Sequence, residues 1–277
     1  MPDDTQGARY LLGIEPLHDT MRFLGQHSPS EWDPAHLARQ HTTAQAIRRA
    51  RSYRPPTVAT PPASWMAHIS RLEQRPLFQQ LFDRAGVRIA EVGLADLIPI
   101  QPHVHFAYAQ QRAAEPGTAL SVCLSADPEP ISVQGGISED RDDLAFTVTT
   151  PDLNLAVTEA HLDTRHGVEV SFRVSRTSVF CQVVQVGTHL ILTDGTHRAV
   201  GLLAQGAATL PCLLTEHAEP WQLPSHLDPA LLLGPHPPLM RDFLDPALHV
   251  PHTWPLRRKV IRIRVDQFVL AADGTTS

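Results

Sequence analysis

The chain has 277 residues, of which 42% are hydrophobic and 19% are charged, and its formal net charge is −6. A chain of this length can bury a sizeable core, in one large domain or two small ones. The acidic balance argues against a protein that coats nucleic acid through its overall charge, but it is compatible with a local basic patch. Because no run approaches the roughly 18 apolar residues of a membrane span, we expect a cytoplasmic protein without a membrane partner.

The first part of the chain is polar and interrupted by prolines. Residues 35–50 have helical spacing and end in basic residues, which predicts a helix. The prolines between 55 and 62 indicate an extended linker, and residues 65–85 again show helical spacing. We therefore predict a helical extension over residues 1–62 and a separate domain over 63–277.

The pattern changes from helical to extended spacing after Gly86. Residues 87–92 alternate as a strand does, and 94–99 indicate a short helix or turn closed by proline. Residues 120–190 are rich in β-forming segments, and Gly135-Gly136 is typical of a turn. The strands predicted here are 120–124, 144–149, 167–174, 178–186 and 188–193.

A strand, a turn and a helix then follow one another without interruption. Residues 188–193 are predicted as the strand, 194–198 as the turn and about 197–205 as a helix, before a strand at 210–214. The first amide groups of a helix have no intrahelical partner, and the helix dipole makes that end positive. A turn of this kind is therefore suited to an anion such as phosphate.

The side chains of the turn suit the same ligand. Gly195 permits close approach of the backbone, Thr196 offers a hydroxyl, and His197 and Arg198 can reach phosphate oxygens. We expect Asp194 to cap the turn or to hold Mg²⁺ through water. The alternative is an ordinary Asp-Gly turn in which Asp194 is the N-cap and no ligand binds.

The run LILTDGTHRAVGLLAQGAATLPCLL resembles the phosphate-binding box of the ParB/sulfiredoxin-like superfamily. In that box a strand leads into a Gly-x-x-Arg or Asp-Gly-x-His-Arg turn, then into a helix that contains alanine and ends at glycine. A strand that begins with a small residue and proline follows. The matching residues are Asp194, Gly195, His197, Arg198, Ala199, Gly206 and Pro211. The upstream run VRIAEVGLADLIPIQPHVHF is similar to the opening box of the family, and its matching residues are Leu94, Leu97, Pro99 and Gln101.

The resemblance implies an α+β fold with a ParB/sulfiredoxin-like mixed-sheet core, an N-terminal helical extension and a β-rich insertion at about 111–180. It implies a nucleoside triphosphate ligand, ATP or CTP, bound with Mg²⁺. The residues that would bind it are Asp194, Gly195, Thr196, His197, Arg198, Gln101 and His103. Thr196 stands where sulfiredoxin has its reactive cysteine, and because a hydroxyl cannot replace a thiolate, sulfiredoxin activity is excluded.

Histidine and cysteine side chains are the candidate metal ligands of this sequence. His103-x-His105 in an extended segment places two imidazoles on one face, and His197 would make a third ligand. The alternative is a pair of polar histidines that line a pocket, and we predict no metal site. The cysteines Cys123, Cys181 and Cys212 are odd in number and widely spaced, which predicts lone buried thiols rather than disulfides.

The last predicted strand, 256–265, is basic on one face. Arg258, Arg262 and Arg264 share that face with Val260. One interpretation is that these charges lie on a solvated face of the sheet, or on an edge strand where charge prevents pairing with another chain. The other interpretation is a basic stripe that contacts DNA or an acidic protein partner.

We therefore predict a ParB-like protein that binds a nucleotide or nucleic-acid phosphate, as a component of a DNA-processing, DNA-modification or defence assembly. One alternative is a nucleotide-dependent small-molecule kinase or NTPase. Its base would come from the stretch around the opening box, which offers Glu91, Asp96, Gln101, His103 and His105. Another alternative is a non-catalytic structural or interaction module. The sequence leaves open whether a reaction is catalysed.

Overall fold

Two compact units make up the structure, which is a computed structural model. The first unit contains Met1–Ala126 and Ser178–Pro255, and the second contains Asp127–Thr177 and Leu256–Ser277. The second unit thus combines part of the predicted insertion with the end of the chain. The structure describes residues 5–27, 32–75, 78–79, 86–114, 118–125, 135–140, 143–150, 155–163, 169–176, 180–216, 219, 223, 228–255 and 259–266.

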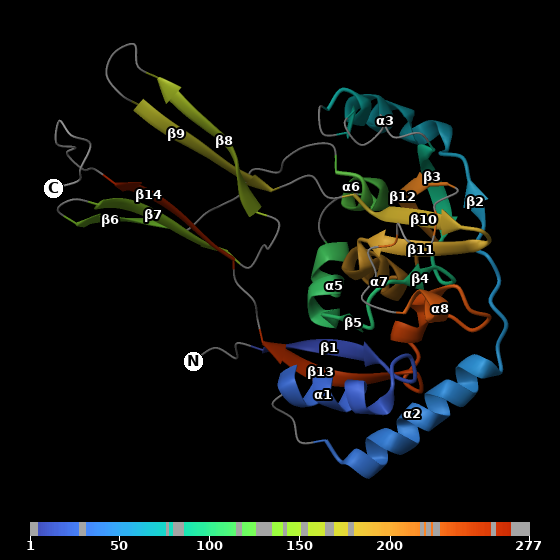
Figure 1. The fold of residues 1–277 in the computed structure, drawn as a ribbon. Helices are drawn as coiled ribbons and strands as arrows, with labels where there is room; N and C mark the ends of the chain where they lie inside the picture. Colours follow the sequence, from blue (N-terminus) through green and yellow to red (C-terminus); the bar gives the residue numbers. More distant parts are fainter. Residues whose placement is uncertain are drawn as a thin grey trace. The chain divides into compact units, whose positions relative to one another are not determined.

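A six-stranded mixed sheet lies at the centre of the first unit (Figure 1). In sheet order its strands are β2 (Val58–Ala59), β3 (Val87–Gly93), β12 (Thr209–Thr215), β10 (Gln182–Val186), β11 (His189–Asp194) and β4 (Ile98–Pro99). The pairs β10–β12 and β11–β4 are parallel, and the other neighbours are antiparallel. The five central residues of β12 are buried, as expected of a strand covered on both faces.

A second sheet of the same unit joins segments that are far apart in the sequence. Its order is β13 (His249–Pro255), β1 (Thr5–Leu11) and β5 (His103–Val104). Successive side chains of β1 point to opposite faces. On one face Tyr10 contacts Phe23 of α1 (Leu17–His27), with ring centroids 4.6 Å apart. The Arg9 guanidinium lies 3.2 Å from the centroid of the Phe106 ring, at the start of α5 (Phe106–Ala113).

Helices cover both sheets. Besides α1 and α5 they are α2 (Pro34–Arg49), η1 (Ala63–Trp65), α3 (Met66–Glu73), α6 (Ala119–Cys123), α7 (Thr196–Ala204), α8 (Pro229–Leu232) and η3 (Met240–Phe243). The N-terminus of α2 is capped by Asp33, whose side chain accepts a hydrogen bond from the amide of Ala35. Near the other end of α2, Arg48 and Arg51 both contact Asp242 of η3. These contacts attach α2 to the body of the unit.

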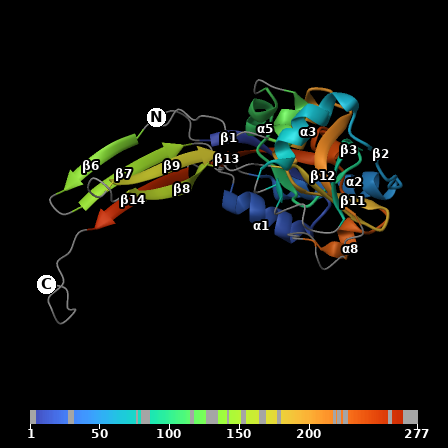
Figure 2. The same ribbon diagram turned by 90° about the horizontal axis from the view of Figure 1, so that it is seen from above.

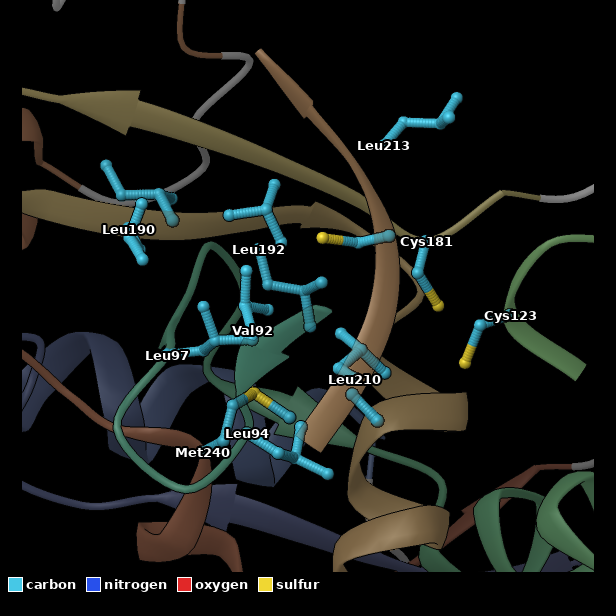
Figure 3. Packing of buried hydrophobic residues seen from close by; sticks show 14 of the residues in the cluster. Val92, Leu94, Leu97, Cys123, Cys181, Leu190, Leu192, Leu210, Leu213 and Met240 are labelled. Carbon is cyan, nitrogen blue, oxygen red and sulfur yellow. The ribbon is translucent and has the colours of Figure 1, made fainter. Parts of the chain in front are cut away.

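The larger hydrophobic core packs the central sheet against the helices (Figure 3). Leu192 of β11, Leu210 of β12 and Met240 of η3 are all members of this cluster. A smaller cluster around Tyr10 and Leu24 fills the space between the second sheet, α1 and α2. Burial of these apolar surfaces is the main force that holds the elements together.

The second unit consists of antiparallel strands (Figure 2). One sheet has the order β14 (Lys259–Asp266), β7 (Asp143–Thr150) and β6 (Gly135–Asp140), and a separate hairpin pairs β8 (Leu155–Asp163) with β9 (Glu169–Arg176). In β14, Val260 and Arg262 are exposed and Ile261 is buried, so the predicted alternation is present at these positions.

The predicted α+β fold class is confirmed. The helix expected at 35–50 is α2, and the strand–turn–helix–strand expected between 188 and 214 is β11, α7 and β12. None of the helices in the described part of the chain combines the length and the apolar character that crossing a bilayer requires.

Several local predictions are wrong. Residues 120–124 were expected to form a strand, but Ala119–Cys123 is the helix α6, which the Thr118 side chain caps by accepting a hydrogen bond from the amide of Ser121. Gly135-Gly136 begins β6 rather than forming a turn. In the segment 94–99 the predicted turn is present, but it leads into the short strand β4, which was not predicted. The elements β1, α1 and β13 were not predicted at all.

Candidate functional site

The turn between β11 and α7 has the backbone that the sequence predicted. Gly195 has a φ of 95° and is the N-cap of α7, and no side chain caps this helix. This φ lies in the left-handed region, which favours glycine. Asp194 therefore does not cap the helix. Its carboxylate is half-exposed and lies 3.6 Å from the Arg198 guanidinium.

Arg198 points into the protein rather than toward solvent. Its side chain is only 6% exposed. Its Nη1 and Nη2 atoms donate to the carbonyls of Val122 and Phe180, each at 3.5 Å. The sequence suggested that this arginine reaches phosphate oxygens directly. The structure instead places its charge beneath the turn, where it contributes positive potential without extending from the surface.

Thr196 begins α7 and is 5% exposed. In the first turn of a helix, its hydroxyl stands beside backbone amides that have no intrahelical partner.

His197 connects α7 to α5. The backbone amide of His105, the N-cap residue of α5, donates a hydrogen bond of 3.1 Å to Nε2 of His197. An accepting Nε2 carries no proton, so the ring is neutral and its proton is on Nδ1. Burial, followed by the neighbouring His105 and Arg198, lowers the pKa of His197 to about 3. The positive charge at the turn at neutral pH is therefore that of Arg198.

The helices α5 and α7 lie side by side (Figure 1). His105 contacts His197, and four residues later in both helices Ala109 contacts Gly201. Equal steps of about one turn along both helices mean that the two helices run in the same general direction. The N-termini of α5 and α7 therefore meet at the His105–His197 contact.

The predicted ligands Gln101 and His103 lie on the segment that leads into α5. The His103 ring lies between Phe23 and His105, with centroid distances of 5.4 and 5.9 Å. Gln101 follows β4 and is half-buried. Because β4 and β11 are parallel, the chain leaves both strands at the same edge of the sheet, so Gln101 and Asp194 lie toward one end of this sheet.

The three arginines of the basic stripe belong to the second unit. Arg262 is exposed on β14, and Arg264 is on the same strand, opposite Ala145 of β7. Arg258 lies outside the described residues. These residues are therefore carried by a different unit from the one that contains the α7 turn.

The cysteines are buried and free, as predicted, but Cys123 and Cys181 are not isolated from each other. The Cys181 amide donates a hydrogen bond of 2.8 Å to the carbonyl of Cys123. Cys181 also lies against the α7 turn, because a Cβ added at Gly195 would stand 2.5 Å from its Sγ. The sequence offered no sign of this pair, since the two residues are far apart and follow no motif spacing.

A cavity of about 320 Å³ lies elsewhere in the first unit. It is lined by Gly13, by Arg48 and Arg49 at the end of α2, and by the segment around α8. No residue of the α7 turn lines it. Among the described residues, no group of three or more histidine, cysteine or acidic side chains is placed to hold a metal ion.

Comparison with known proteins does not place the chain in a family. No protein-family model, no curated protein and no solved structure matches it.

Proposed function

We propose that this protein binds the phosphate groups of a nucleotide at the N-terminus of α7, as its resemblance to the ParB/sulfiredoxin-like superfamily implies. The observation that carries the proposal is the meeting of two helix N-termini at the contact between His105 and His197. Each N-terminus has unpaired amides and the equivalent of about half a positive charge. Two such ends at one place, with Arg198 buried beneath them, favour a polyanion.

Each residue of the turn has its own role in this proposal. The first amides of α7 and the Thr196 hydroxyl donate hydrogen bonds to phosphate oxygens. His197 donates from Nδ1 as a neutral ring, and Arg198 stabilises the negative charge from beneath. When Mg²⁺ accompanies the nucleotide, Asp194 holds it through water, which its half-exposed carboxylate permits.

The contacts of the nearby carboxylates support a binding role rather than catalysis. Glu91 accepts a hydrogen bond of 2.5 Å from the Thr209 hydroxyl, and Asp96 forms an ion pair of 2.8 Å with Arg241. Both carboxylates that the sequence offered as bases are thus engaged with other side chains. We therefore favour a binding component of a DNA-processing, DNA-modification or defence assembly. The kinase or NTPase alternative then depends on His103 or His105 as the base.

Calorimetry and thermal shift with ATP, CTP, GTP and a short DNA duplex, each with and without Mg²⁺, test the proposal. The matched variants are Thr196→Val, which removes the hydroxyl and keeps the shape, and Thr196→Ser, which keeps the hydroxyl. We expect Thr196→Val to weaken binding of one triphosphate by about 5–10-fold, since a hydrogen bond contributes about 1 kcal/mol. Thr196→Ser should bind like the wild type.

The other outcomes are equally informative. If none of these ligands binds the wild type, the phosphate site does not exist. If a nucleotide binds equally well to wild type, Thr196→Val and Arg198→Lys, it binds elsewhere. DNA binding that survives Thr196→Val and is lost in Arg262→Ala would move the function to β14. Hydrolysis or transfer of the γ-phosphate would favour the enzyme alternative.

A further inference from the structure

Cys123 and Cys181 are opposite each other across an antiparallel pairing. Leu124 and Phe180 form an antiparallel bridge, so the preceding Cys123 pairs with the following Cys181. One hydrogen bond, from the Cys181 amide to the Cys123 carbonyl, joins the two residues. Residues opposite each other in an antiparallel pairing have Cα atoms about 4.5–5.5 Å apart, which lies within the range found in disulfides.

The two thiols are in contact and differ in acidity. Their side chains point toward each other (Figure 3), and the Cys123 thiol donates a hydrogen bond to the Cys181 sulfur. This hydrogen bond, together with the nearby charge of Arg198, lowers the pKa of Cys181. The same interaction, followed by burial, raises the pKa of Cys123. Cys181 therefore ionises first, and the thiolate is the reactive form of cysteine.

We propose that Cys123 and Cys181 form a peroxide-reactive dithiol, in which Cys181 is oxidised first and Cys123 then closes a disulfide with it. The proposal does not depend on phosphate binding. It assigns a redox-modified site beneath the α7 turn, and it differs from sulfiredoxin chemistry because neither cysteine belongs to the turn.

The reaction has two steps with hydrogen peroxide as the oxidant. The Cys181 thiolate attacks one peroxide oxygen, the O–O bond breaks, and a hydroxide leaves and takes up a proton to become water. Cys181 is now a sulfenic acid. The Cys123 sulfur then attacks the Cys181 sulfur, the S–O bond breaks, and the departing hydroxide takes the Cys123 proton. In sum, two thiols and one peroxide yield one disulfide and two waters.

The surroundings of the pair select the oxidant by size. Both thiols are buried, so an oxidant must enter the protein to reach either sulfur. Exchange with a bulky disulfide requires direct access to the attacking sulfur. We therefore expect hydrogen peroxide to oxidise the folded protein and glutathione disulfide to leave it reduced.

Cys212 provides an internal control. It is the third buried thiol and lies in β12, opposite Ala90 of β3. Burial raises the pKa of Cys212, so this thiol keeps its proton at neutral pH. It should therefore stay reduced under conditions that oxidise the pair.

The experiment exposes the folded full chain to hydrogen peroxide, blocks the remaining thiols and maps the peptides by mass spectrometry. We expect the intact mass to fall by two hydrogen atoms and the digest to contain a peptide that links Cys123 to Cys181. Cys212 should remain a free thiol. Cys123→Ser should stop at a sulfenic acid on Cys181, which a cyclic 1,3-dione reagent captures. Cys181→Ser should leave Cys123 unreacted.

The wild-type map alone can overturn the proposal, so the test does not depend on the variants folding. The proposal fails if no Cys123–Cys181 peptide forms, or if Cys212 is oxidised as fast as Cys181. It also fails if the linked peptide appears only when denaturant is present. Equal reaction with glutathione disulfide would contradict the selection by size.

Discussion

Gly201 of α7 lies against the backbone carbonyl of Ala109 in α5. A Cβ added at position 201 would stand 2.1 Å from that oxygen, much closer than two such atoms ever approach. The two helices therefore touch backbone to backbone. This close contact allows the N-cap of α5 to reach His197 one turn earlier, and so it holds together the two helix ends on which the candidate site depends.

Gly201→Ala should destabilise the protein, because α5 and α7 must move apart to admit the methyl group. Overpacking costs about 1–3 kcal/mol, which exceeds the roughly 1 kcal/mol by which alanine is the better helix former. We expect a lower free energy of unfolding in urea titrations and weaker nucleotide binding. The control is Gly25→Ala in α1, where nothing lies within 4 Å of the added Cβ. That change should stabilise, and equal effects at both positions would contradict the close contact.

Gly195→Ala should be costly for two separate reasons. The φ of 95° disfavours any side chain, and the new Cβ would collide with Cys181. Together these effects should lower the free energy of unfolding by about 3 kcal/mol. Gly187→Ala isolates the first effect, since Gly187 has a φ of 58° and open space around its Cβ. Denaturant titrations should give it the smaller loss.

A double-mutant cycle isolates the collision with the sulfur. In a Cys181→Ala background, Gly195→Ala should cost about 1 kcal/mol less than in the wild type. A coupling energy near zero would mean that the turn does not press on Cys181.

The neutral His197 should make the protein less stable in mild acid. Its pKa of about 3 in the folded state is below the ordinary value of 6.5. Its contribution is therefore fully present above pH 6.5 and is lost as the pH falls toward 3, because the unfolded chain binds the proton more readily. Between pH 7 and 5 the loss should be about 2 kcal/mol.

The variant His197→Gln keeps an acceptor for the amide of His105 but cannot titrate. Its free energy of unfolding should fall less than that of the wild type over the same pH range. Comparing the two proteins removes the contribution of His249, whose pKa is also lowered by burial. Parallel pH profiles would show that His197 is not held neutral.

Asp242→Asn should be strongly destabilising. The Asp242 carboxylate is fully buried and bonds to Arg48 and Arg51, and it also accepts the amide of Leu239. Removing one partner of a buried ion pair leaves uncompensated charge and costs about 3–5 kcal/mol. Asp96→Asn, in the more exposed pair with Arg241, should cost no more than about 1 kcal/mol. Chemical denaturation of both variants measures the contrast, and similar losses would contradict it.

The amino-acid sequence by itself determined the elements whose cues are local. The helical spacing of residues 35–50 predicted α2, and the Asp-Gly turn predicted both the end of β11 and the start of α7. Such patterns succeed because apolar periodicity, capping and glycine turns act over a few neighbouring residues. The same logic failed at 120–124, where a cap by Thr118 outweighed the β-forming side chains of a short segment.

Only the tertiary structure decided which of these elements meet. Thr5 pairs with Pro255, α5 packs against α7, and Cys123 faces Cys181. No local sequence feature predicts any of these three contacts. The direction of Arg198 was decided in the same way, because it bonds to backbone carbonyls that other elements bring beneath the turn. These contacts form because apolar faces that are distant in the chain are buried together, and the spacing of neighbouring residues does not predict which faces meet.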